Sequence, residues 1–158
     1  MSKDLYFLRS SEQKIIDNLA PLAHPKDSIN LELYTKFYGL STKDLGLYAL
    51  IDNKIAGAIW SRELNGNQET PILSVALYPE FRNQGIGSFM MEQFLLEVAT
   101  RYERLQIDIS HMPQTIKFYE SFGFEKIQDS KKVILLKKLD KKAIDRPTDG
   151  YDPRRWMD

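Results

Sequence analysis

The sequence predicts a single α/β domain in which helices flank a mixed sheet. Apolar residues recur with strand-like frequency over Leu45–Ile51, 55–62 and Ile72–Leu77, and then at helical spacing from Ser88 to about residue 102. An alternating segment at 105–109 follows this helix. The 158 residues are about enough for one domain with its own hydrophobic core. Strands and helices in this succession are typical of a sheet covered by helices.

The first half of the chain is predicted to form a strand, two helices and then three strands. The apolar run 5–8 is the first strand, and the serines at 10 and 11 are suited to cap a helix that ends before Pro25. A second amphipathic helix is expected at about 29–38. Residues 52–54 suit a tight hairpin turn, and the turn cluster 65–68 leads into a third antiparallel strand, Ile72–Leu77.

The second half is predicted to alternate helices with strands. The helix that starts at Ser88 crosses over the sheet, so strand 105–109 is expected to run parallel to Ile72–Leu77. Proline suits the first turn of a helix and glycine its end, which predicts a short helix over 113–122. The runs 124–127 and 133–137 are expected to close the sheet as an antiparallel pair.

Composition excludes several classes of function. Lys plus Arg and Asp plus Glu each count 22, so there is no overall positive field for a nucleic acid or an anionic membrane, and neither partner is expected. No apolar run reaches the roughly 18 residues of a spanning helix, and no signal-peptide pattern is present, which predicts a cytoplasmic protein. The chain has no cysteine and two histidines, His24 and His111, so no metal cofactor is expected.

Composition also divides the chain into a folded domain, 1–139, and a charged C-terminal tail, 140–158. The charges and prolines of the tail are typical of a disordered segment in water. Tyr151, Trp156 and Met157 are costly to leave exposed, however. The tail is therefore expected to be disordered or to dock, either on its own domain or on a second subunit of a homodimer.

Recognisable chemistry is concentrated between strand Ile72–Leu77 and the helix that follows it. Backbone N–H groups at a helix start have no partner within the helix and carry the positive end of its dipole, so they bind phosphate oxygens. Gly85 and Gly87 remove Cβ atoms that would hold a phosphate away, and Arg82 can add a charge-assisted contact. A pyrophosphate suits this segment, although a merely tight turn also accounts for two glycines.

Spacing excludes two other nucleotide motifs. A dinucleotide fingerprint requires a third glycine where this chain has Met90, and a P-loop requires Gly-Lys-Ser/Thr where it has Gly87-Ser88-Phe89.

Two motifs remain, Arg82-x-x-Gly85-x-Gly87 and, further along, Phe118-Tyr119-Glu120-Ser121-Phe122-Gly123-Phe124. In this order they resemble the GNAT superfamily of acetyl-CoA-dependent N-acetyltransferases. The first is similar to that family's pyrophosphate-binding motif, and the second to its helix with Phe-Tyr before Gly-Phe. The resemblance extends over 5–138. It implies a mostly antiparallel sheet with a splayed central parallel pair, flanked by helices.

The resemblance also implies where acetyl-CoA binds as co-substrate. The pantetheine arm enters between strands Ile72–Leu77 and 105–109 and bonds the backbone of Val75, Ala76 and Leu77. The pyrophosphate is held beside Arg82 by the amides of a second set of residues, Gln84, Gly85, Ile86, Gly87 and Ser88. The hydroxyl of Ser88 can add to those amides or simply cap the helix.

Tyr119 is the candidate acid. A phenol with a pKa near 10 stays protonated at neutral pH and can protonate the departing coenzyme A thiolate. Taken without the resemblance, Tyr119 reads as an aromatic core residue, because Phe118 and Phe122 at i,i+4 spacing pack beside it. The resemblance favours the catalytic role.

The chain departs from the family's usual pattern near the reaction centre. Met112 and Thr115 stand where many members have Asn and Ala. Many members also carry a carboxylate base on the strand before the glycine turn, where this chain offers Ser74. His111 is the main candidate base, because histidine titrates near neutral pH. Three alternatives stay open for the base: Glu63, Glu69, or a reaction that uses no side-chain base.

The resemblance places the acceptor site around residues 19–40 and the hairpin strands, which include Trp60 and Arg62. The polar and aromatic candidates in the first of these segments are His24, Asp27, Glu32, Tyr34 and Tyr38. The implied activity is direct acetyl transfer to a primary amine of a small molecule, peptide or protein. Two alternatives stay open, a catalytically weak acyl-CoA-binding or sensing module of the same fold and an unrelated nucleotide-binding protein.

Overall fold

The computed structural model describes residues 2–24, 35, 36, 38, 44–63, 70–110, 112–127 and 133–139. Its strands are β1 (Lys3–Phe7), β2 (Leu45–Ile51), β3 (Lys54–Arg62), β4 (Ile72–Leu77), β5 (Arg104–Asp108), β6 (Glu125–Ile127) and β7 (Ile134–Lys138). Its α-helices are α1 (Gln13–Ala23), α3 (Ile86–Val98) and α4 (Ile116–Glu120), and three 3₁₀ turns are η1 (Ser10–Glu12), η2 (Pro79–Phe81) and η3 (Pro113–Thr115). The expected helix at 29–38 lies outside the described residues except for 35, 36 and 38, and so does the whole tail 140–158.

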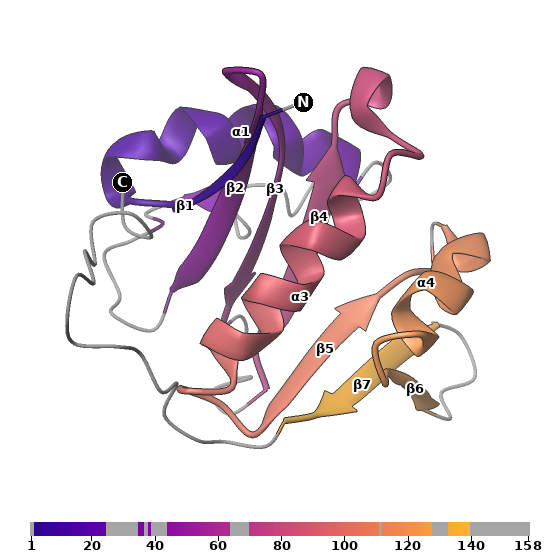
Figure 1. The fold of residues 1–158 in the computed structure, drawn as a ribbon. Coiled ribbons are helices and arrows are strands. Elements are labelled where there is room, and N and C mark those ends of the chain that lie inside the picture. Colours follow the sequence, from indigo (N-terminus) through magenta and orange to yellow (C-terminus); the bar gives the residue numbers. More distant parts are fainter. Residues whose placement is uncertain are drawn as a thin grey trace, which may run out of the picture.

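The strands form one seven-stranded sheet in the order β1-β2-β3-β4-β5-β7-β6 (Figure 1). Every neighbouring pair is antiparallel except β4 and β5, which are parallel. The crossover that the parallel pair requires is made by α3. The predicted mixed sheet, its hairpin and its closing antiparallel pair are therefore confirmed.

The hairpin between β2 and β3 turns on Asp52 and Asn53, which both have positive φ, 51° and 67°. Ile51 pairs with Lys54, so the loop has two residues. A two-residue turn with both residues left-handed matches the right-handed twist of strands, and Asp and Asn tolerate this conformation. The turn signal in the sequence is confirmed.

The parallel pair β4–β5 is joined at one end. Ile72 of β4 is the partner of Gln106 of β5, and this is the one residue pair between the two strands in the described part of the chain. The Gln106 backbone N–H donates to the Pro71 carbonyl oxygen at 3.1 Å, and its side-chain amide donates to the Thr70 carbonyl oxygen at 2.8 Å. Beyond this end the two strands diverge, whereas β5 stays paired with β7 along its length (Figure 1).

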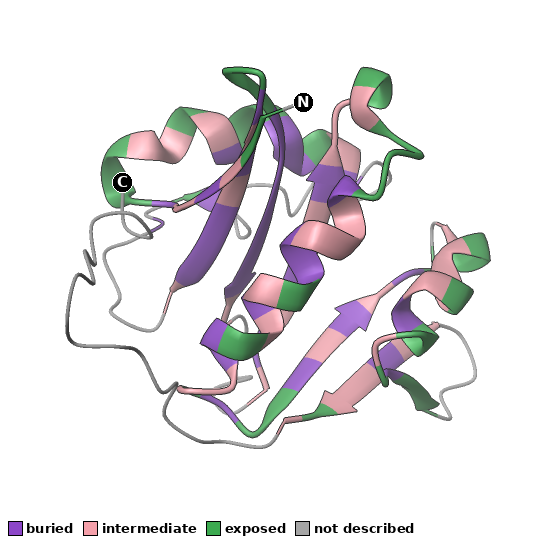
Figure 2. Ribbon diagram, viewed as in Figure 1, coloured by how far each residue is buried: buried purple, intermediate pink, exposed green. Residues whose placement is uncertain are grey.

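Helices cover the two faces of the sheet. α3 packs against β2, β3 and β4, and α1 packs against β3 and β4 from the other side. Side chains of β4 alternate between the two cores, with Leu73 in the α3 core and Ala76 in the α1 core. Figure 2 shows buried residues concentrated on the strands and exposed ones at the turns and outer sides of the helices. No described helix is long and apolar enough to span a bilayer.

The crossover helix differs from its predicted limits. α3 begins at Ile86, two residues before the expected Ser88, because Gly85 takes a left-handed conformation and serves as its N-cap. It ends at Val98 rather than near 102, and the Thr100 hydroxyl donates to the Glu97 carbonyl oxygen at 2.7 Å. A side-chain hydroxyl that bonds the backbone in this way competes with continued helix. The predicted helix 113–122 is divided into η3 and α4, and α4 ends at Glu120, two residues earlier than expected. Gly123 has a left-handed φ of 92° in the turn that follows, as predicted.

Candidate active site

The glycine-bearing turn follows β4 and η2 and leads directly into α3. Asn83 and Gly85 both have positive φ, 63° and 78°. Gly85 is the N-cap of α3, and a side chain there would be strained by the backbone conformation although nothing lies within 4 Å of the Cβ position. The glycine at this point is therefore required by the chain's own turn.

The turn leaves a row of backbone donors without backbone partners. Phe89 is the first residue of the helix whose N–H bonds a preceding carbonyl, that of Gly85, at 3.1 Å. Within the described residues, the N–H groups of 83–88 donate to no backbone carbonyl. These donors lie at the positive end of the helix dipole, where an anion is favoured. The arrangement is that expected of a phosphate-binding helix start.

The reason for a glycine at position 87 differs from the reason at position 85. A Cβ at residue 87 would lie 3.5 Å from the Phe118 ring and 3.8 Å from Leu77 Cδ1, which are ordinary contact distances. The protein's own packing thus accommodates a side chain here. The missing Cβ instead keeps the surface over the helix start open to a molecule that approaches the amides closely.

A cleft of about 450 Å³ lies over these amides. It is bounded by the end of β4, the glycine turn, the start of α3, and the segment η3–α4. The residues lining it are Leu22, Val75, Ala76, Leu77, Arg82, Asn83, Gly85, Ile86, Gly87, Ser88, Met112, Thr115, Phe118 and Tyr119. The structure thus brings together on one cleft the predicted strand residues, most of the predicted pyrophosphate site and the predicted acid.

Gln84 is the predicted binding residue that does not line the cleft. Its side-chain amide donates to the Glu80 carbonyl oxygen at 3.0 Å. The neighbouring Arg82 is exposed and folds back so that its Nε donates to the Leu77 carbonyl oxygen at 3.3 Å. The guanidinium is therefore held at the end of β4, at the mouth of the cleft.

Tyr119 lies on α4 and is 7% exposed. Its ring makes edge-to-face contacts with Phe118 and Phe124, at centroid distances of 5.1 and 5.7 Å. Burial raises the pKa of Tyr119 well above that of an ordinary phenol, which corrects the expectation of an unperturbed value. The hydroxyl is therefore a neutral donor at the cleft wall over the whole physiological pH range. The aromatic packing predicted from i,i+4 spacing is also present, with Phe118 and Phe122 at 5.3 Å.

The two residues that depart from the family pattern also line the cleft. The Thr115 hydroxyl donates to the Met112 carbonyl oxygen at 2.7 Å, and the Met112 N–H donates to the Ile109 carbonyl oxygen at 2.9 Å. These bonds fix the turn that leads from β5 into α4. An apolar thioether consequently stands at this wall in place of an amide side chain.

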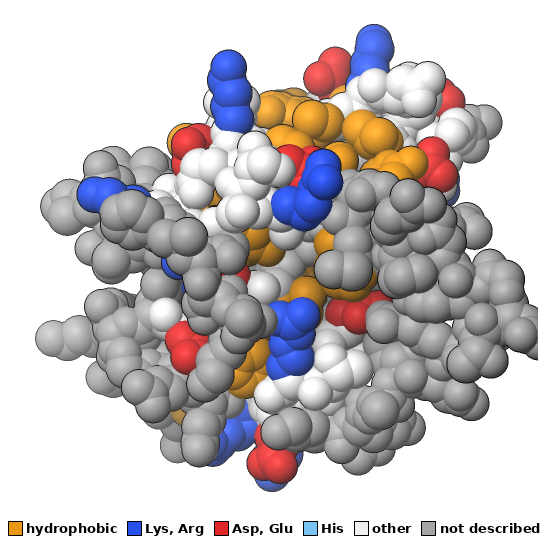
Figure 3. All heavy atoms as spheres, turned by 90° about the vertical axis from the view of Figure 1, so that its left-hand side faces the viewer, with side chains coloured by type: hydrophobic (Ala, Val, Ile, Leu, Met, Phe, Trp, Pro, Cys, Tyr) orange, Lys and Arg blue, Asp and Glu red, His pale blue; other side chains and the backbone are white. Residues whose placement is uncertain are grey.

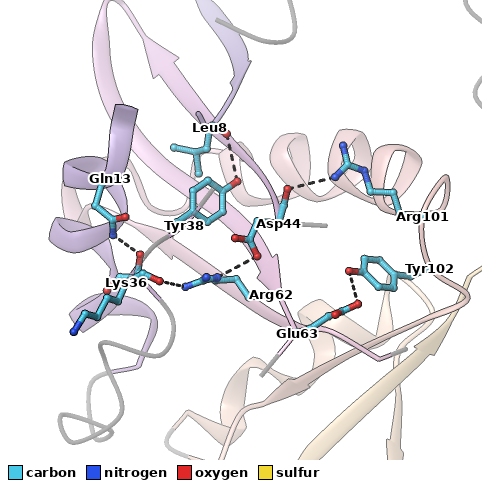
Figure 4. Close-up of polar contacts among 10 residues, drawn as sticks. Leu8, Gln13, Lys36, Tyr38, Asp44, Arg62, Glu63, Arg101 and Tyr102 are labelled. Atoms are coloured by element: carbon cyan, nitrogen blue, oxygen red, sulfur yellow. Dashed lines mark hydrogen bonds and ion pairs between the residues drawn. The ribbon is translucent and has the colours of Figure 1, made fainter. Parts of the chain in front are cut away.

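Of the candidate bases, His111 and Glu69 lie outside the described residues. Glu63 follows β3 and accepts a hydrogen bond from the Tyr102 hydroxyl at 2.9 Å (Figure 4). Because β3 and β4 are antiparallel, Glu63 lies near the start of β4, at the opposite end from the glycine turn. It is not among the residues that line the cleft.

Sequence reasoning did not predict that His24 reaches β4 from another element. His24 follows α1, and its Nε2 lies 2.7 Å from Ser74 Oγ. The two residues are fifty positions apart, so no local spacing in the sequence predicts this contact. His24 was expected only as a possible lining residue of the acceptor site. No group of three or more metal-ligating side chains gathers within the described ranges.

Several residues expected around the acceptor make contacts within the protein (Figure 4). The Tyr38 hydroxyl donates to the Leu8 carbonyl oxygen at 3.4 Å. Arg62 pairs with Asp44 at 3.2 Å and donates to the Lys36 carbonyl oxygen at 2.7 Å. Trp60 is fully buried in the α1 core. Asp27, Glu32 and Tyr34 lie outside the described residues.

The surface does not gather charge of one sign on the face viewed in Figure 3. Basic and acidic side chains of the described residues are interspersed there, with apolar side chains between them. The distribution agrees with the formal net charge of zero.

Comparison with known proteins gives a family match. A family model described as "Acetyltransferase (GNAT) domain" matches residues 43–126, more than half of the chain. This stretch includes β2 to β5, the glycine turn and the helix with Tyr119. No curated protein sequence matches the chain.

Solved structures give the same fold. A PaiA N-acetyltransferase from Thermoplasma acidophilum, in complex with coenzyme A, is 16% identical over 87% of this chain and 99% of its own, with a TM-score of 0.65. A GNAT superfamily phosphinothricin acetyltransferase from Sinorhizobium meliloti, in complex with AcCoA, is 15% identical over 98% and 97%, with a TM-score of 0.69. A GNAT family acetyltransferase from Elizabethkingia anophelis, with acetyl-CoA bound, is 20% identical over 87% and 98%, with a TM-score of 0.63.

Proposed function

The chain belongs to the GNAT acetyltransferase family, and we propose that it transfers an acetyl group from acetyl-CoA to a primary amine by direct attack in a ternary complex. The observation that carries this proposal is the row of unpaired amides at 83–88, which opens onto the same cleft as Tyr119. One wall of the cleft suits a diphosphate and the other offers a proton donor. A thioester carrier with a diphosphate linker needs both.

The residues of the cleft fit acetyl-CoA along its length. The amides of 84–88 and the Arg82 guanidinium would hold the diphosphate. The edge of β4 that faces β5 has no strand partner beyond Ile72, so the backbone of Val75, Ala76 and Leu77 can bond the pantetheine amides. When bound, acetyl-CoA supplies an activated thioester carbonyl. Much of the rate would come from holding that carbonyl and the amine together.

Tyr119 would act as general acid. Its proton passes to the sulfur of the departing thiolate, and the phenol is restored from solvent or from the proton that the attacking nitrogen releases. The buried ring packs against Phe118 and Phe124, so the hydroxyl is presented in a fixed position. Burial keeps the hydroxyl protonated until that step.

Thermal denaturation tests the binding half of the proposal. Acetyl-CoA at a hundred times its dissociation constant should stabilise the fold by roughly 2.7 kcal/mol, whereas ATP and NAD should have little effect. Stabilisation by ATP alone would instead support an unrelated nucleotide-binding protein.

A screen for free thiol release, with acetyl-CoA and a panel of small amines, amino acids and peptides, tests the catalytic half and the acceptor class together. Release that depends on one class of amine would support the transfer reaction. Binding without release for any acceptor would support the second candidate function, an acyl-CoA sensing module. Met112 at the cleft wall and the absence of a carboxylate on β4 favour that candidate.

A further inference from the structure

A buried histidine and serine lie beside the cleft, and the scheme above gives them no role. His24 Nε2 and Ser74 Oγ are 2.7 Å apart, and the two residues are 6% and 1% exposed. A hydrogen bond of this length between an imidazole and a hydroxyl joins α1 to the middle of β4. Each partner is thereby held in one orientation.

Both chain segments that carry the pair also line the cleft. Leu22 of α1, two residues before His24, is a lining residue. On β4, Val75 follows Ser74 directly, and Ala76 shares with Ser74 the face of the strand that is turned toward α1. Neither His24 nor Ser74 is itself a lining residue, so the pair lies directly behind the cleft wall, at the strand proposed to hold the pantetheine.

The proposed reaction needs a proton acceptor for the amine. A primary amine such as that of lysine has a pKa near 10.4, so at neutral pH its nitrogen is protonated and has no electron pair for attack. Ser74 is the one polar side chain of β4. At neutral pH a serine hydroxyl does not take up an additional proton by itself. It can, however, accept one proton while it passes its own to an imidazole.

We propose that His24 takes up the proton of the acceptor ammonium group through Ser74, an inference that rests on the proposed acetyl transfer. The ammonium N–H bond breaks as a water molecule at the cleft wall accepts that proton and passes one of its own to Ser74 Oγ, and the original hydroxyl proton passes to His24 Nε2. The products are a neutral amine, an unchanged serine and an imidazolium, which later releases its proton to water. His24 acts through Ser74 and is a positioning and relay residue.

Three phenols and one carboxylate are further titratable groups at or beside the buried α1 core, and the Glu12 carboxylate is hydrogen-bonded to the Tyr48 hydroxyl. Tyr38, Tyr48 and Tyr78 belong to or pack against this core, while β3 contributes Trp60. Burial raises the pKa of Tyr38 and of Tyr48 above the usual phenol range, so these two stay neutral where an imidazole titrates. The charged groups that act on Tyr38 are Asp44, Arg101, Arg62 and Glu12.

The test combines His24→Gln with Ser74→Ala and Ser74→Thr. Glutamine can keep a hydrogen bond to Ser74 but cannot carry the proton, and threonine keeps the hydroxyl that alanine removes. With an amine found in the thiol-release screen, the wild-type kcat/KM should fall at acid pH, with a midpoint that reports the protonation of His24. His24→Gln and Ser74→Ala should lower kcat at pH 7 by roughly 100-fold and abolish that midpoint. Ser74→Thr should restore it, and acetyl-CoA affinity should stay unchanged in all three.

Nuclear magnetic resonance gives a readout that does not depend on turnover. The chain has two histidines, so the ring signals of His24 are those missing from His24→Gln. Their titration midpoint should move in Ser74→Ala and return in Ser74→Thr. An unchanged midpoint in Ser74→Ala would overturn the coupling of the two side chains.

Three other results would overturn the relay. One is a His24→Gln enzyme with the wild-type pH profile. Another is an acetylated Ser74 in the intact mass after incubation with acetyl-CoA alone, because Ser74 would then be a nucleophile. If the wild type binds acetyl-CoA but releases no thiol with any amine, the proposed function fails and the relay fails with it. An active wild type with an unaffected His24→Gln removes the relay alone.

Discussion

The two ends of the β4–β5 pair differ in what their backbones bond. At the start of β4, Ile72 and Gln106 pair, and the Gln106 side chain adds a bond to Thr70. At the other end the strands diverge, and the cleft over the glycine turn lies beside the unpaired edge of β4. The comparison teaches that one strand pair can give stability at one end and an open cleft, the proposed binding site, at the other. Substitutions at the two ends should therefore affect different measurements.

The largest expected effect is at the open end, with Gly87→Glu. Its side chain would place bulk and negative charge over the amides of 83–88, so acetyl-CoA binding should weaken by more than about 100-fold. Isothermal titration calorimetry measures this loss.

Gly87→Ala is the matched control. Its Cβ meets the Phe118 ring at an ordinary 3.5 Å, and alanine favours helix over glycine by up to about 1 kcal/mol. The free protein should therefore melt at an equal or higher temperature while its affinity for acetyl-CoA falls. Tight binding by Gly87→Glu would show that the diphosphate lies elsewhere.

Tyr119→Phe should have the next largest effect. It removes the proposed acid and leaves the aromatic contacts with Phe118 and Phe124, so kcat should fall by roughly 100-fold. The dissociation constant of acetyl-CoA should change little. Steady-state kinetics measures kcat, and a binding titration on the same preparation measures the dissociation constant. An unaltered kcat would show that Tyr119 is not the acid.

Gln106→Met tests the closed end and should have a smaller effect. It keeps the length of the side chain but removes the donor to Thr70, which should cost about 1 kcal/mol of unfolding free energy. Urea denaturation measures the change. Acetyl-CoA affinity should stay at the wild-type value, and a loss of affinity as large as that of Gly87→Ala would contradict the division between the two ends.

The smallest effect is expected at alkaline pH. Burial raises the pKa of Tyr119 at the open end, and burial and the hydrogen bond to Glu63 raise that of Tyr102 near the closed end. Above about pH 10 the unfolded chain loses these phenolic protons while the folded chain keeps them, so stability should fall as pH rises. Tyr119→Phe and Tyr102→Phe should each make the fall shallower, and a slope that neither changes would show that other groups govern it.

Much of the fold could be predicted from the sequence because its signals are local. The Asp52–Asn53 turn, the apolar run Ile72–Leu77 and the Gly123 stop each depend on neighbouring residues, and the structure confirms them. The limits of α3 were less predictable. Gly85 starts the helix early and the Thr100 hydroxyl competes for a carbonyl, and hydrophobic spacing registers neither effect.

The candidate site was predictable where it follows a continuous segment, as in the turn around Gly85 and Gly87. It was not predictable where packing assembles it from distant segments. Ser74 offers no acid–base chemistry by itself, and its neighbour His24 comes from a helix fifty residues away. The raised pKa of Tyr119 likewise depends on burial, which the position of a tyrosine in a motif does not give.

The backbone N–H of Gln106 can be used to measure how often the sheet opens. It bonds the Pro71 carbonyl oxygen at 3.1 Å, where strands β1 to β4 meet strands β5 to β7. Its hydrogen exchanges with deuterium only when that junction parts, so the exchange rate measures how often the two groups of strands separate. A molecule that binds between the two groups of strands and holds them together should slow the exchange of this same backbone N–H.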